Sequence, residues 1–188
     1  MSIKALQRRA REAHQWLGQR ALPLWADVGM LREGGVVSAL QLNHRPNEAP
    51  EPGTPQAQVA MANLFALAPA VGFDRAISED VLAKLKAAEN TALEQDVRFA
   101  AAHSLEAICD DLRLSLISLT TADNTAANGV SEAACRAFDT LMDDFLTPEG
   151  GWFVGYGEDG LLSHPDIPAA LAGAVAAPMA LLLPLAQA

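Results

Sequence analysis

The chain has 188 residues, of which 51% are hydrophobic but only 5% are aromatic. This balance favours one domain of packed helices over a β-sandwich. Its formal net charge of −10 argues against nucleic acids and anionic membrane surfaces as partners, because both repel an acidic chain. Cys109 and Cys135 are the only cysteines and lack the spacing of a metal site or a disulfide framework, so we expect reduced core thiols in a cytoplasmic protein.

The first helix is predicted over residues 2–22. Pro23 should end it, because the residue before a proline is pushed out of the helical conformation. His14 falls on its surface, and residues 34–46 beyond it should form a short hairpin. The apolar face of this helix, read from three- and four-residue steps, consists of Ile3, Leu6, Ala10, Ala13 and Leu17.

A second helix should begin at Thr54-Pro55, with the threonine as cap and the proline at the first helical position. Gly72 should end it, and a third helix should open at Ser78 with acidic residues in its first turn. The predicted inward face of the second helix consists of Val59, Ala62, Phe65, Ala66 and Ala70.

The second half of the chain predicts three more helices. A capping box at residues 91–94 opens a helix with apolar residues at helical steps over 93–116. A fifth helix is expected over 131–148, and a sixth begins at Pro168 with a kink at Pro178.

The C-terminal stretch, residues 167–188, carries no charged side chain and is long enough to cross a bilayer. It is also rich in alanine, contains Pro168, Pro178 and Pro184, and lacks a basic flank. We therefore interpret it as a buried helix and expect no membrane partner. The basic N-terminus lacks the uninterrupted apolar stretch of a signal peptide.

One unit occurs twice, at residues 21–46 and 141–160: a helix end, paired glycines, a short β-like run and a polar turn. Trp25 and Trp152 occupy equivalent places in it. Such repeats are typical of arrays in which each unit needs neighbours to bury its apolar face. We predict a single all-α domain over residues 1–188. About six helices should form a partial α/α toroid with short β-hairpins at one rim, where a cavity would open.

Four segments together resemble the N-acylglucosamine 2-epimerase family, which includes mannose isomerases and cellobiose 2-epimerase. They are residues 21–46, the helix QAQVAMANLFALAPAVGF at 56–73, His103-Ser104-Leu105-Glu106-Ala107, and residues 134–152. The resemblance implies a ring of six helix pairs and isomerisation of a sugar at C2. The implied chemistry is proton abstraction next to a carbonyl, with histidines as acid and base.

The chain departs from the family pattern at positions that matter for catalysis. The family's two arginines in the second segment fall on Gln56 and Ala60, and its tyrosine falls on Asn63. Of two histidines common in the central helix, the first falls on Ala101 and only His103 remains.

The last segment of the chain can be aligned with the family in two ways. Aligned with the family's closing stretch, Pro168 to Leu171 matches and a catalytic histidine becomes Ala174. Aligned with a middle repeat, Pro165 matches and the histidine becomes Ile167. The chain also has about half the helices of the ring, so the cavity cannot close within one chain. A half-ring left by an internal deletion is one interpretation of the domain, and a deleted gene product that folds poorly is a further one.

His103 is the candidate catalytic base, and Glu106, three residues later, could orient it or stabilise its charge. The alternative is a helical histidine without function. Candidate substrate contacts are Tyr156, His164, Trp25 and Asn63; a packing role is the alternative for Trp25, and a solvated loop position is the alternative for His164. His44 is expected to be a turn residue. No metal site and no cofactor are expected, since no two histidines pair at i, i+4 on one helix.

The sequence therefore predicts a carbohydrate epimerase or isomerase that acts on an aldose or N-acylhexosamine, with impaired or absent catalysis. The alternative is a non-catalytic helical binding or interaction module descended from that family. The expected partners are a small-molecule sugar and a second copy of the chain, which would dock through exposed apolar helix faces.

Overall fold

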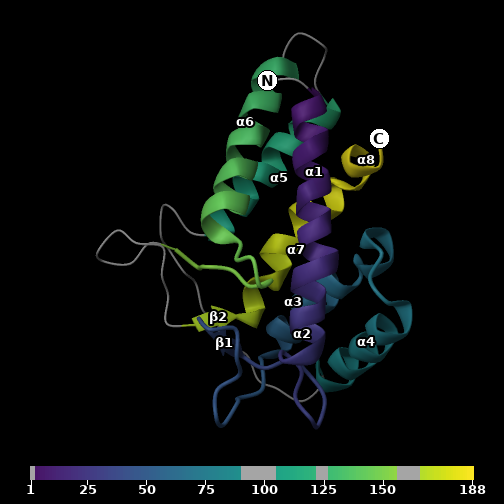
Figure 1. The fold of residues 1–188 in the computed structure, drawn as a ribbon, viewed down its shortest axis with the longest axis vertical. Helices are drawn as coiled ribbons and strands as arrows, with labels where there is room; N and C mark the ends of the chain where they lie inside the picture. The colour runs from purple at the N-terminus through teal and green to yellow at the C-terminus, as the bar shows by residue number, and fades with distance from the viewer. Residues whose placement is uncertain (1–2, 90–104, 122–126, 156–165) are drawn as a thin grey trace.

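The computed structural model describes residues 3–89, 105–121, 127–155 and 166–188, which are mostly helical, with one two-stranded sheet (Figure 1). This confirms the all-α class. The observed helix bounds agree with the predicted ones where local patterns in the sequence determine them, and differ where contacts between distant residues do.

The N-terminal helix continues through the proline that was expected to end it. Helix α1 (Ile3–Trp16) passes through a π-helical turn (Leu17–Ala21) into α2 (Leu22–Asp27). In the wide turn the Leu22 N–H donates to the carbonyl of Leu17. Pro23 then falls in the first turn of α2, where the missing N–H of a proline is tolerated.

The predicted buried face of α1 is largely confirmed. Leu6, Ala10, Ala13 and Leu17 are fully buried, whereas Ile3 at the start of the helix is exposed. The surface position expected for His14 is wrong. This side chain is buried, with its Nε2 3.0 Å from the carbonyl oxygen of Met179.

Helix α3 (Pro55–Phe65) begins as predicted: Thr54 Oγ1 accepts a hydrogen bond from the Ala57 N–H. A 3₁₀ turn (Ala68–Val71) follows and ends at Gly72, whose φ of 74° is the left-handed conformation that glycine favours. The predicted inward face is wrong for Val59, Ala66 and Ala70, which are exposed. Because α3 is apolar on nearly all sides, periodicity did not identify the face that packs. The residues that are buried are Ala57, Gln58, Ala60, Met61, Leu64 and Phe65.

Helix α4 (Arg75–Glu89) begins before Ser78, because Asp74 caps it by accepting a hydrogen bond from the Ile77 N–H. Helix α5 spans Leu105–Thr121, and α6 (Ala127–Asp139) runs into a second π-helical turn (Thr140–Phe145). The capping box predicted at residues 91–94 lies outside the described residues.

The strand expected within a local hairpin has a distant partner instead. Strand β1 (Ala39–Gln41) pairs in antiparallel fashion with β2 (Asp166–Pro168), so that Leu40 lies opposite Ile167. The chain then forms a 3₁₀ turn (Ala169–Leu171), α7 (Ala172–Leu181) and α8 (Leu183–Gln187).

Helix α7 lies at the centre of the arrangement. It packs against α3 on one side and α5 on the other, and α1 contacts α6, α7 and α8 (Figure 1). Val175 and Met179 of α7 are fully buried, as expected for an uncharged core helix. Among the described residues, no helix is long and apolar enough to span a membrane.

Candidate functional site

A shallow, open hollow of about 390 Å³ lies where α3 meets α7. The two helices approach closely here, since a Cβ added to Gly173 of α7 would lie 3.3 Å from the Cβ of Ala60. None of the described residues that line the hollow is charged, and two of them carry amide side chains. The lining consists of Pro55, Gln56, Val59, Ala60, Asn63 and Gly173.

The candidate site residues fall in different places. Asn63 lines the hollow and is exposed. Glu106 is exposed in the first turn of α5 and does not line it. His103, Tyr156 and His164 lie outside the described residues.

Trp25 packs in the core, which was the alternative to a contact with substrate. Its side chain is fully buried and stacks on the equally buried Trp152, with ring centroids 5.2 Å apart and planes 20° from parallel. The tryptophans of the two repeated units therefore form one contact inside the core. This contact leaves Trp25 no surface for a sugar in this structure.

All three tryptophans of the chain lie around one junction, where the turn 147–151 approaches α1, the turn 41–45 and β2. Trp152 Nε1 donates to the carbonyl of Pro168 at the end of β2, with a donor–acceptor distance of 3.1 Å. Trp16 Nε1 donates to the carbonyl of Thr147 at 2.7 Å. The junction thus ties α1 to Thr147, and Trp152 to β2.

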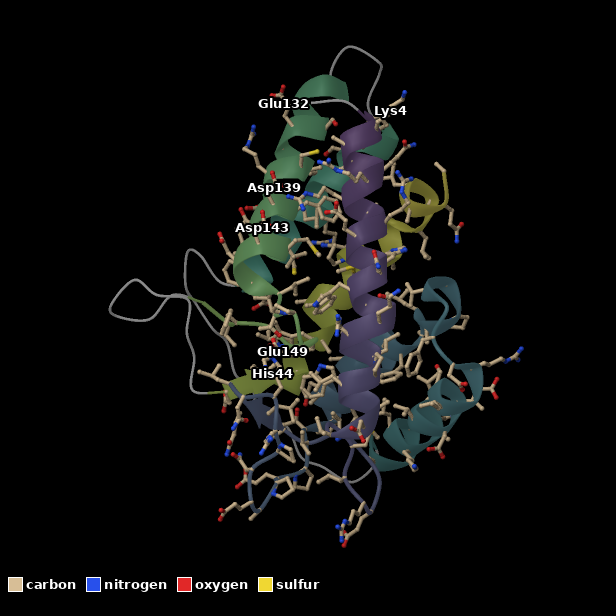
Figure 2. All side chains as sticks on the ribbon, viewed as in Figure 1. Lys4, His44, Glu132, Asp139, Asp143 and Glu149 are labelled. Atoms are coloured by element: carbon tan, nitrogen blue, oxygen red, sulfur yellow. The ribbon has the colours of Figure 1, made fainter. Side chains whose placement is uncertain are left out.

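A polar cluster that sequence reasoning did not assemble lies at this same junction. His44 is a turn residue, as expected, with a φ of 62°, but its Nε2 also lies 2.7 Å from Thr147 Oγ1. Glu149 Oε2 lies 3.8 Å from the same nitrogen, and Figure 2 shows the two side chains next to each other. No signal in the sequence pointed to this cluster, since His44 lies in the polar turn of the first repeated unit and Thr147 and Glu149 lie at the paired glycines of the second.

The surroundings of His44 favour its neutral form. Burial lowers its pKa, and the negative charge of Glu149 offsets this in part. Neutral imidazole offers one nitrogen as acceptor, which suits the hydroxyl of Thr147.

Both cysteines are buried and free, as predicted. Burial raises the pKa of each thiol, with smaller contributions from nearby carboxylates, so neither has the thiolate character of a reactive cysteine. Among the described residues, no group of three or more His, Cys, Asp or Glu side chains could hold a metal ion.

A second and larger hollow, of about 710 Å³, lies between the loop after α2 and the proline-rich loop before α3. Its apolar wall includes Met30 and Val37, and its rim carries Arg32 and Glu48. None of the described candidate site residues, Trp25, Asn63 and Glu106, lines this second hollow.

No protein-family model, no curated protein and no solved structure matches this chain.

Proposed function

We propose that the chain is a shortened member of the N-acylglucosamine 2-epimerase family that keeps a sugar-binding hollow but has lost isomerase activity. The observation that carries this proposal is the lining of the hollow between α3 and α7. Gln56, Ala60 and Asn63 all line it, and these are the positions that the resemblance aligns with two arginines and a tyrosine of the family. A sequence alignment and a surface feature thus select the same face of α3.

The partial toroid belongs to the same proposal. Strand β2 and α7 lie against β1 and α3, the neighbours that a segment closing a ring would meet at its first repeat. This supports the alignment of residues 168–171 with the family's closing stretch. Ala174 then stands where the family has a histidine, next to Gly173 in the hollow.

The chemistry of the hollow supports binding without turnover. Enolisation at C2 needs a base and a group that stabilises the developing oxyanion. The described lining instead offers the amides of Gln56 and Asn63, which can donate and accept hydrogen bonds with sugar hydroxyls. Proton abstraction would depend on His103, supported by Glu106 on α5.

The test is an NMR experiment with mannose, glucose and N-acetylmannosamine in D₂O. We expect saturation transfer to at least one sugar and no exchange of the C2 proton. Asn63→Ala should weaken binding about fivefold, the loss of roughly one hydrogen bond, while Gln15→Ala, which removes an exposed amide from α1, should not.

Two results would contradict the proposal. C2 exchange that disappears in His103→Ala would identify a working isomerase. Absence of saturation transfer to all three sugars would leave the chain without a sugar site.

An interaction module is the second candidate, favoured by exposed apolar side chains on three helices. Val59 of α3 is 41% exposed, Leu114 of α5 is 55% exposed and Leu181 of α7 is 37% exposed. Because Val59 also lines the hollow, a second copy docked there would cover it.

A further inference from the structure

Two turns that are distant in the sequence are fastened together by one histidine. The first is the turn 41–45, closed by hydrogen bonds between Gln41 N–H and the Arg45 carbonyl and between His44 N–H and the Gln41 carbonyl. The second is the turn 147–151, closed by the bond between Thr147 N–H and the Gly151 carbonyl. We call the contact of His44 with Thr147, Glu149 and Gly151 the clasp.

The hydrogen bonds of the clasp suit a neutral His44. Thr147 is buried, and its Oγ1 accepts from the Gly151 N–H at 2.9 Å. Its own proton then has His44 Nε2, at 2.7 Å, as acceptor. This assignment pairs the hydroxyl proton of Thr147 with the ring and uses a neutral imidazole with its proton on Nδ1.

The packing around the ring leaves little freedom for another arrangement. A Cβ added to Gly151 would lie 2.8 Å from His44 Nε2, so only glycine admits the ring there. His44 itself holds a left-handed backbone conformation that residues other than glycine rarely adopt. Such conformations persist where surrounding contacts hold them.

We propose that the clasp is a proton-sensitive latch, and that protonation of His44 loosens the junction of the turns 41–45 and 147–151. A proton on Nε2 turns this nitrogen into a donor, so it can no longer accept from Thr147. The buried hydroxyl then loses its acceptor, which is costly for a group away from water. The imidazolium is drawn toward the exposed carboxylate of Glu149, 3.8 Å away.

The charged groups around His44 determine the direction of the pH effect. Glu149 faces the ring and raises its pKa, but burial lowers the pKa by more. Among the described residues, Arg45 lies beside His44, Asp166 lies on β2, and the backbone of Arg20 lies against Gly150. Asp143 and Asp144 belong to the π-helical turn before Thr147.

Because its folded pKa is depressed, His44 takes up its proton more readily in the unfolded chain. The stability that the clasp contributes is therefore complete above the ordinary histidine pKa of 6.5. It is lost as the pH falls through 6.5 toward the lower folded pKa.

The chain contains a built-in reporter of the latch. Trp16 donates to the carbonyl of Thr147 within the clasp turn, and the Trp25–Trp152 stack lies at the same junction. Since these are all the tryptophans of the chain, intrinsic fluorescence reports on this junction.

The test follows tryptophan fluorescence and the urea midpoint of the full chain as the pH is lowered. We expect a reversible fluorescence change below pH 6.5, together with a fall in the urea midpoint. His44→Asn should abolish the change, because asparagine tolerates the left-handed backbone and does not titrate. His14→Gln, which removes the buried histidine of α1, should retain it.

Glu149→Gln provides a second test in which folding is not at risk, since this side chain is 58% exposed. Removing the charge that raises the His44 pKa should move the fluorescence midpoint to lower pH. A transition that persists unchanged in His44→Asn, a midpoint that stays in place or moves upward in Glu149→Gln, or a flat response in the wild type would overturn the proposal.

Discussion

Trp25 and Trp152 share one stack but differ in how their indole N–H groups are satisfied. Trp152 Nε1 has the carbonyl of Pro168 as its acceptor, whereas Trp25 Nε1 is buried with no partner among the described residues. A buried donor without an acceptor costs stability, and one with an acceptor contributes to it. We therefore expect the two side chains to stabilise the core similarly through apolar burial. The indole N–H contributes favourably to stability at Trp152 and unfavourably at Trp25.

The pair offers a matched test. Trp152→Phe removes a hydrogen bond and leaves the Pro168 carbonyl without its donor, while Trp25→Phe removes a donor that has no partner. We expect Trp152→Phe to lower the free energy of unfolding by about 1 kcal/mol more than Trp25→Phe, measured by urea denaturation followed by circular dichroism. Equal losses, or a larger loss for Trp25→Phe, would mean that the indole N–H of Trp25 is satisfied in solution.

Arg9 ties the N-terminal helix to the end of α6. Its Nε donates to Asp139 Oδ1 at 2.8 Å, and Nη1 donates to Glu12 Oε2 at 2.7 Å. The hydrogen bond to Glu12 contributes most to raising the Arg9 pKa, so the side chain stays charged. Figure 2 labels Asp139 at the end of α6 and Asp143 in the π-helical turn that follows it.

This contact joins elements far apart in the chain, so its removal should be measurable. We expect Arg9→Gln to lower the free energy of unfolding by about 1 kcal/mol, and the loss should shrink at high salt. Arg75→Gln is the matched control, because the Arg75–Glu79 pair joins two exposed side chains of the same helix and should contribute less to stability. A salt-independent loss at Arg9 would point to packing of its methylene chain instead.

At the level of elements, the sequence predicted what local chemistry decides. Thr54-Pro55 fixed the start of α3, because a cap and a proline act within one turn. The pairing of β1 with β2 was missed because three-residue strands carry no pattern that identifies a distant partner. The helix end predicted at Pro23 was wrong for a similar reason, because the π-helical turn before Pro23 depends on how the helix packs. At Gly18 in this turn, an added Cβ would lie 2.5 Å from the Val71 carbonyl oxygen.

The candidate site was predictable only where it lies on one helix. Asn63 and its neighbours on α3 could be selected by alignment. Gly173 lines the hollow because α7 packs against α3, and no local pattern in the sequence predicts that packing. The clasp joins residue 44 to residues 147–151, and no local pattern in the sequence predicts a contact between segments so far apart.

Across the whole molecule, charge is distributed unevenly. The chain carries a net charge of −10, yet residues 55–65 and 167–188 contain no charged residue. Two copies of so acidic a chain repel each other over most of their surface. Helices α3 and α7 add no charge to this repulsion, and their exposed side chains Val59 and Leu181 would gain from burial.

If the chain acts as the interaction module, the second candidate function, rather than as a sugar-binding protein, we expect a homodimer through the face formed by α3 and α7, and sedimentation velocity is the measurement that checks it. Val59→Glu places a charge on the α3 side of the face and should raise the dimer dissociation constant at least about tenfold, because the carboxylate would lose its water in the interface. Ile77→Glu adds the same charge to α4, where Ile77 is 47% exposed among charged neighbours, and should leave the dimer intact. A wild-type protein that sediments as a monomer at all concentrations would exclude the dimer, and equal weakening by both variants would indicate general charge repulsion rather than docking through α3 and α7.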